Sequence, residues 1–135
     1  MFYKITLIGL IFTLYSCQNE AEKKRYNLTN GTEKYWILNE YTDKNGISQK
    51  TNKLVLKFAE NYDFVEYLND HMELFTFKDS DDIKPNKWYL KNDSTLNLNY
   101  IDYSIIILNE DTLKLKKKID DCQYLYTPTT SKKFK

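Results

Sequence analysis

The residues that could carry chemistry in this sequence are few and scattered. The chain of 135 residues holds one histidine, His71, and two cysteines, Cys17 and Cys122. A catalytic site needs a nucleophile beside a base, or carboxylates paired in a cleft, and nothing in the spacing here assembles either. His71 lies in the polar stretch 69–73, which predicts an exposed turn, and Cys122 reads as a small buried apolar residue. We therefore expect no enzymatic activity.

The sequence also lacks the residue patterns that bind metal ions, cofactors or nucleic acids. One histidine and three glycines cannot supply a histidine cluster or a Gly-rich phosphate loop. Residues 79–82 (Asp-Ser-Asp-Asp) alternate oxygen ligands but lack the Gly and bidentate Glu of a calcium loop, so they predict a solvated loop. Basic and acidic residues balance at 20 against 19, and Arg25 is the only arginine. We expect no metal, no cofactor and no nucleic acid.

The amino terminus carries an export signal. Residues 5–14 form an uncharged apolar run of ten residues, too short to span about 30 Å of hydrocarbon but typical of a signal peptide. Leu14-Tyr15-Ser16-Cys17 looks like a bacterial lipobox, in which a branched residue and a small residue position the Cys thiol for diacylglycerol transfer and cleavage. We predict a lipoprotein signal peptide at 1–16 and a lipidated Cys17. An ordinary secreted protein or an uncleaved anchor is the alternative.

Lipidation of Cys17 would hold the protein on a membrane without a transmembrane helix. Two or three acyl chains bind a bilayer more firmly than the marginal binding of one chain. Gln18 rather than Asp follows the Cys. By resemblance to proteobacterial sorting, this implies the outer membrane. Residues 17–34 are polar and lack an apolar period, which predicts a flexible tether.

From Tyr35 onward the pattern has a period of two, and turn signals recur about every ten residues. Residues 35–127 therefore predict an all-β domain, followed by a basic tail at 128–135. Because the connections are too short for helical crossovers, we expect an antiparallel up-and-down meander of about eight strands, closed into a barrel or half-barrel. Alternation also assigns Lys114, Lys116, Lys117 and Lys118 to an outer face. The expected inward-facing residues are Trp36, Leu38, Leu54, Leu56, Phe58, Phe64, Trp88, Leu90, Leu96, Leu98, Ile105, Leu113 and Leu115.

The order of these signals resembles the bacterial lipocalin-like lipoprotein domains of Gram-negative envelopes. The resemblance covers about residues 35–117 and rests on the following motifs: Tyr35-Trp36-Ile37-Leu38, Leu54-x-Leu56-x-Phe58, Trp88-x-Leu90, Leu96-x-Leu98 and Tyr103-x-Ile105-x-x-Leu108. The sequence departs from the pattern at Lys87, where a Gly commonly precedes the second Trp. The resemblance implies a β-barrel or half-barrel and little about activity.

Two functions follow as hypotheses. The first is a membrane-anchored module that holds a small apolar or amphipathic molecule at the barrel mouth. The second is an envelope interaction module, which residues 103–108 favour because they are apolar on both faces. It could equally be a structural module whose barrel is filled by its own side chains. The candidate ligand-lining residues are Trp36, Phe58, Phe64, Phe77, Trp88 and Tyr100.

Overall fold

The computed structural model describes residues 19–70, 73–76 and 86–130. In these ranges the chain forms one helix, at residues 19–29, and ten strands. The strands are β1 (Glu33–Thr42), β2 (Ser48–Lys50), β3 (Leu54–Ala59), β4 (Asp63–Asp70), β5 (Glu73–Thr76), β6 (Asn86–Asn92), β7 (Thr95–Leu98), β8 (Ile101–Leu108), β9 (Leu113–Lys117) and β10 (Gln123–Thr129).

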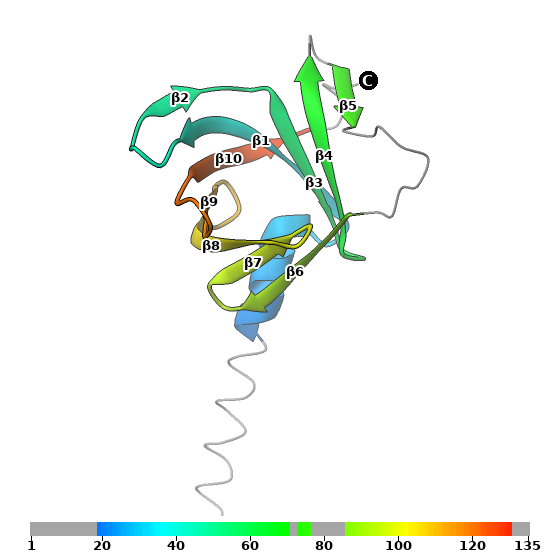
Figure 1. Ribbon diagram of the computed structural model, residues 1–135. Helices are drawn as coiled ribbons and strands as arrows, with labels where there is room; N and C mark the ends of the chain where they lie inside the picture. Colours follow the sequence, from blue (N-terminus) through cyan, green and yellow to red (C-terminus); the bar gives the residue numbers. More distant parts are fainter. Residues whose placement is uncertain (1–18, 71–72, 77–85, 131–135) are drawn as a thin grey trace, which may run out of the picture.

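The strands form one antiparallel meander that closes nearly into a ring (Figure 1). Hydrogen-bonded neighbours follow the order β10-β9-β8-β7-β6-β4-β3-β1, and β10 pairs in turn with β1. Strands β2 and β5 extend β1 and β4. The junction between β4 and β6 is short, with register pairs at Asp63–Lys87 and Phe64–Asn86. The predicted all-β meander of about eight strands is thus confirmed.

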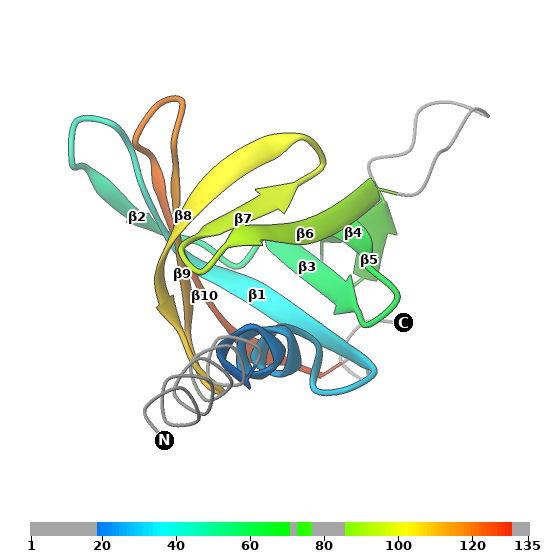
Figure 2. The same cartoon turned by 90° about the horizontal axis from the view of Figure 1, so that it is seen from below.

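The two ends of the ring differ. One end, which we call the helix end, carries the turns after β3, β6 and β8, and the N-terminal helix lies against it (Figure 2). Lys24 donates to the carbonyl of Asp93 in the β6–β7 turn, and Lys34 donates to the carbonyl of Glu110 in the β8–β9 turn, at 2.9 Å. The other end carries the turns after β1, β7 and β9, and we call it the open end.

The helix corrects the predicted flexible tether over residues 19–34. Leu28 is completely buried, and its carbonyl accepts a hydrogen bond from the indole N–H of Trp36 at 3.1 Å. Asn30 and Gly31 end the helix with positive φ values of 56° and 84°, a left-handed cap that glycine adopts without strain. The segment is ordered because Leu28 enters the core, although its sequence lacks a broad apolar stripe. This described helix is not long and apolar enough to cross a membrane.

The core agrees with the predicted alternation. Every one of the predicted inward-facing residues is either buried in the main cluster or packed against it, and the cluster also contains Leu28 and Tyr126. The domain boundaries are wider than predicted, since β1 starts at Glu33 and β10 runs through Pro128, which pairs with Trp36. Residues 131–135 of the predicted tail lie outside the described residues.

Replacing Trp36 with Phe should lower the free energy of unfolding by about 1–3 kcal/mol, because the buried Leu28 carbonyl loses its donor. Chemical denaturation of the purified domain measures this change. Ile119→Ala, at a site that is 83% exposed, serves as the control and should stay within about 0.5 kcal/mol. Equal stability of Trp36→Phe and the parent would show that the helix is not held by this contact.

Candidate functional site

Four of the predicted ligand-lining residues lie together at the helix end of the interior. Trp36, Phe58, Phe64 and Trp88 are at most 1% exposed. The ring of Phe58 lies 5.3 Å from Phe64 and 5.8 Å from Trp88, between centroids. Trp36 is the cross-strand neighbour of Leu56, and Trp88 that of Leu98. These side chains fill the helix end with aromatic packing.

The other two predicted lining residues do not join this group. Tyr100 lies in the tight turn between β7 and β8 with a φ of 70°, and its side chain is 94% exposed. It belongs to the outer rim of the open end, close along the chain to the exposed Ile101. Phe77, together with His71 and the acidic run 79–82, lies outside the described residues.

Polar side chains occupy inward positions toward the open end. Glu66 pairs with the core residue Leu56 and lies between Phe64 and Leu68 on β4, so the alternation of the strand turns its side chain inward. Lys117 follows Leu113 and Leu115 at the same two-residue spacing on β9 and therefore also faces inward. This corrects the prediction that Lys117 lies on the outer face. The inward-facing polar set, which we call the open-end cluster, consists of Glu66, Tyr103, Lys117, Tyr124 and Tyr126.

Burial dominates the electrostatics of Glu66. Loss of hydration raises the pKa of its carboxyl group, and the positive charge of Lys117 offsets this only in part. Lys117 forms an ion pair with Asp120 at 3.8 Å. Within the three described ranges, no hydrogen bond or ion pair shorter than 4 Å reaches the Glu66 carboxylate. Glu66 is thus a half-buried charge that lacks a close counter-ion in the described part of the chain.

The tyrosines of the open-end cluster form a continuous aromatic wall with Tyr41. Tyr124 lies 5.3 Å from Tyr41, 6.0 Å from Tyr103 and 6.4 Å from Tyr126, between ring centroids. Tyr41 donates a hydrogen bond to the Sγ of Cys122 at 3.2 Å, which raises the pKa of Tyr41 to about 12. Burial raises the pKa values of Tyr103, Tyr124 and Tyr126. These phenols are therefore neutral at physiological pH.

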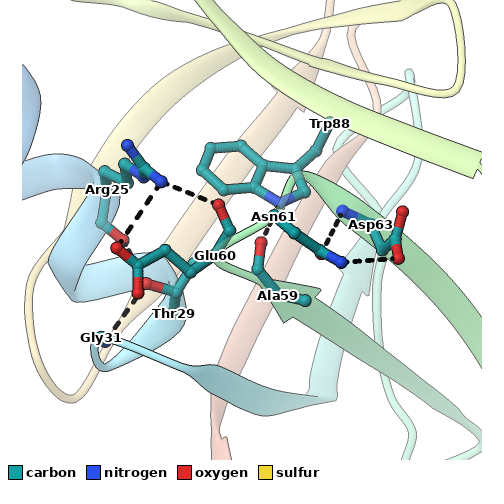
Figure 3. A network of polar contacts seen from close by, with 8 residues as sticks. All are labelled: Arg25, Thr29, Gly31, Ala59, Glu60, Asn61, Asp63 and Trp88. Carbon is teal, nitrogen blue, oxygen red and sulfur yellow. Dashed lines mark hydrogen bonds and ion pairs between the residues drawn. The ribbon is translucent and has the colours of Figure 1, made fainter.

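A recess of about 580 Å³ lies between the helix and β6 at the helix end. Figure 3 shows the polar contacts beside it, where Arg25 donates to the carbonyl of Glu60 at 2.8 Å and Trp88 donates to that of Ala59 at 2.9 Å. The Arg25 guanidinium also lies 4.8 Å from the ring centre of Tyr62, and Lys87 forms an ion pair with Asp63. Only the buried Nε of Arg25 lacks a partner there among the described residues. Arg25 and Lys87, the cations beside this recess, therefore have polar or ionic partners. Glu66 has no such partner among the described residues.

Comparison with solved structures identifies the architecture. A lipocalin-like protein from Bacteroides uniformis superposes with a TM-score of 0.57 at 15% identity, covering 71% of this chain and 96% of that one. An uncharacterized protein from Bacteroides eggerthii gives a TM-score of 0.56 at 13% identity, covering 71% and 98%. The fold is lipocalin-like. No family model matches the chain, and no curated protein matches it in sequence.

The fold alone assigns neither a reaction nor a ligand, because one fold hosts many unrelated functions. Among the described residues, no group of three or more His, Cys, Asp or Glu side chains could hold a metal ion.

Replacing Glu66 with Gln should stabilise the protein at pH 7. A carboxyl group whose pKa is raised in the folded state stabilises the fold fully below its unfolded pKa, near the model-compound value of 4.5, and this contribution is lost as pH rises through the folded pKa. Gln carries no charge to desolvate, so the Tm of the variant should exceed that of the parent at pH 7, and the difference should vanish near pH 4. A variant that melts lower at pH 7 would mean that ionised Glu66 is well compensated in the fold.

Proposed function

We propose that this protein is a lipid-anchored, lipocalin-like lipoprotein of the bacterial envelope that holds a small amphipathic molecule at the open end of its ring. The observation that carries the proposal is the open-end cluster: the Glu66 carboxylate, which has no hydrogen bond or ion pair to another described residue, and Tyr103 and Tyr124, which are partly buried against the core. Burying a charge without a partner is costly unless a ligand or water satisfies it. Such groups, gathered at one end of a lipocalin-like ring, favour a binding site over a purely structural module.

The shape of the open end suits an amphipathic ligand. Leu54 and Ile105 are partly buried against the core and supply apolar surface toward the open end. Strand β4 pairs with β6 only up to Phe64 in the described chain and pairs with β5 from Tyr67 onward. Glu66 therefore lies where the wall of the ring parts, and Figure 1 shows β4 and β5 rising away from β6 there.

The proposed anchor on Cys17 comes just before the helix in the sequence. Cys17 is two residues before the helix, which packs at the helix end. Two residues span at most about 7 Å, so a lipid on Cys17 would hold the helix end near the bilayer and turn the open end away from it. This orientation leaves the binding site accessible from the aqueous side of an outer membrane.

Lipid attachment is tested by expressing the full chain and its Cys17→Ser variant in a Gram-negative host fed with labelled palmitate. The parent should incorporate the label and sediment with outer-membrane vesicles. The Cys17→Ser variant should lose both properties, because it has no thiol to receive diacylglycerol. An unlabelled parent would rule out the lipoprotein assignment.

Ligand binding is tested with the mature domain carrying Cys17→Ser and the neutral fluorescent probe N-phenyl-1-naphthylamine. The probe should bind the open end and lose affinity at least about fivefold in Tyr124→Ala, which removes the central ring of the aromatic wall. The matched control is Tyr89→Ala, at an exposed position on β6. Equal probe affinity in the two variants, or no binding by the parent, would refute a site at the open end.

The interaction-module alternative is supported by one feature of β8. A bulge between Ile105 and Ile107 leaves Ile106 49% exposed and Ile107 40% exposed on the outer surface. Leu108 instead packs against the core. If this surface bound another protein, the Ile106→Lys variant would lose an envelope partner that the Tyr89→Ala variant still retains in cross-linking.

A further inference from the structure

We propose that the open end of the ring docks on a lipid surface through hydrophobic side chains in its three turns. These residues, which we call the apolar tips, are Ile47 in the β1–β2 turn, Tyr100 in the β7–β8 turn and Ile119 in the β9–β10 turn. Their exposed fractions are 59%, 94% and 83%, the three highest of any large hydrophobic residue in the described chain. The inference goes beyond the proposed function, because it requires neither a ligand in the ring nor a lipid on Cys17. With the proposed anchor at the helix end, the tips would meet a lipid surface other than the anchoring bilayer.

Hydrogen bonds and strand pairing join the three turns into one rim. The backbone N–H of Lys118 donates to the carbonyl of Asp102 at 3.1 Å, which connects the β9–β10 turn to the start of β8. Thr42 pairs with Gln123, so the β1–β2 turn lies beside the β9–β10 turn (Figure 1 and Figure 2). The β6–β7 and β8–β9 turns of the helix end, by contrast, contain polar residues only. The two ends of the ring therefore present different surfaces.

The backbone of the turns holds the apolar tips in water. Tyr100 has a φ of 70°, a left-handed conformation that bulky residues seldom adopt. The side-chain oxygen of Asn97 accepts a hydrogen bond from the Tyr100 N–H at 3.0 Å and keeps the turn in this form. In the β1–β2 turn, one carboxylate oxygen of Asp43 accepts from the N–H of Asn45 at 2.8 Å and from that of Ile47 at 3.0 Å. Strained backbone of this kind gathers at functional sites, which points to a use for the exposed ring.

The size and surroundings of the apolar tips favour a lipid surface over a protein. Three separate side chains supply much less than the roughly 800 Å² per partner that a stable protein interface buries. A wider protein contact would also have to bury the charged neighbours Lys44, Lys118 and Asp120. The headgroup layer of a bilayer is polar and hydrated, so these charges stay solvated there while the tips reach the acyl chains. Tyrosine is one of the residues enriched at this depth of a membrane.

The first measurement is cosedimentation of the mature chain, carrying Cys17→Ser, with phosphatidylcholine vesicles. The tip variant replaces all three residues: Ile47→Ser, Tyr100→Ser and Ile119→Ser. It should bind at least about tenfold more weakly than the parent, because each change removes an apolar side chain from the contact. The matched control is the double variant Ile106→Ser and Ile107→Ser, which removes two exposed side chains from the outer surface of β8 and should bind like the parent.

The second measurement tests whether a tip enters the acyl region. In vesicles with brominated acyl chains, the fluorescence of the Ile119→Trp variant should be quenched, because bromine quenches tryptophan on contact. The Ile106→Trp variant, on the outer surface of β8, should not be quenched. The native Trp36 and Trp88 are at most 1% exposed and lie out of reach of the quencher.

Loss of vesicle binding in the tip variant alone, together with quenching of Ile119→Trp, establishes the lipid contact. A parent that does not bind vesicles refutes it, as does full binding by a tip variant whose circular dichroism and melting are native. If the tip variant does not fold, the quenching of Ile119→Trp decides. A parent that ignores vesicles but forms a dimer, which the tip variant dissociates in sedimentation velocity, would show that the tips contact a second copy and would refute the lipid surface. The palmitate and probe assays test the proposed function separately.

Discussion

The hydrogen bond from the Trp36 indole to the carbonyl of Leu28 is the contact on which the rest of the structure depends. Trp36 lies on β1, the strand that pairs with both β3 and β10 and so closes the ring. Its indole is fully buried, and the ammonium of Lys34 lies 4.2 Å from the ring centre. Lys34 also donates to the carbonyls of Asn27 and Glu110. Trp36 and Lys34 of β1 thus together connect the closing strand of the sheet with the helix and the β8–β9 turn.

Closing one end of the ring determines what the other end can do. Because Leu28 and the aromatic residues fill the helix end, stability there does not require the open end to be packed. The open end can then tolerate inward polar groups that would be too costly in the middle of a core. The separation explains why Trp36 and Phe58 are fully buried while Glu66, Tyr103 and Tyr124 keep partial contact with solvent.

Strand periodicity made most of the fold predictable. Alternation identified the meander and most of the inward apolar residues, since half-buried strands must show a period of two, but it missed Leu28 and Tyr126. The helix escaped prediction because Leu28 is the one residue of 19–29 that enters the apolar core, so the sequence shows no apolar stripe. The Asn30-Gly31 pair was the available signal for the end of the helix. The inward positions of Glu66 and Lys117 were not predicted, because only apolar residues were assigned to the inner face. Each of the two nevertheless lies two residues from a core leucine or phenylalanine on its strand. The prediction that Tyr100 lines a ligand site is wrong because Tyr100 lies in a tight turn, which the alternation of strand residues does not predict, and it is exposed to solvent.

Inward polar residues are therefore the informative exceptions in this sequence. A carboxylate in phase with Phe64 and Leu68 weakens the fold, because folding removes part of its hydration without supplying a close partner in the described chain. An apolar residue at the same position would extend the core instead. The retained cost of Glu66, set opposite neutral tyrosines, is what a binding site requires and a filled barrel does not.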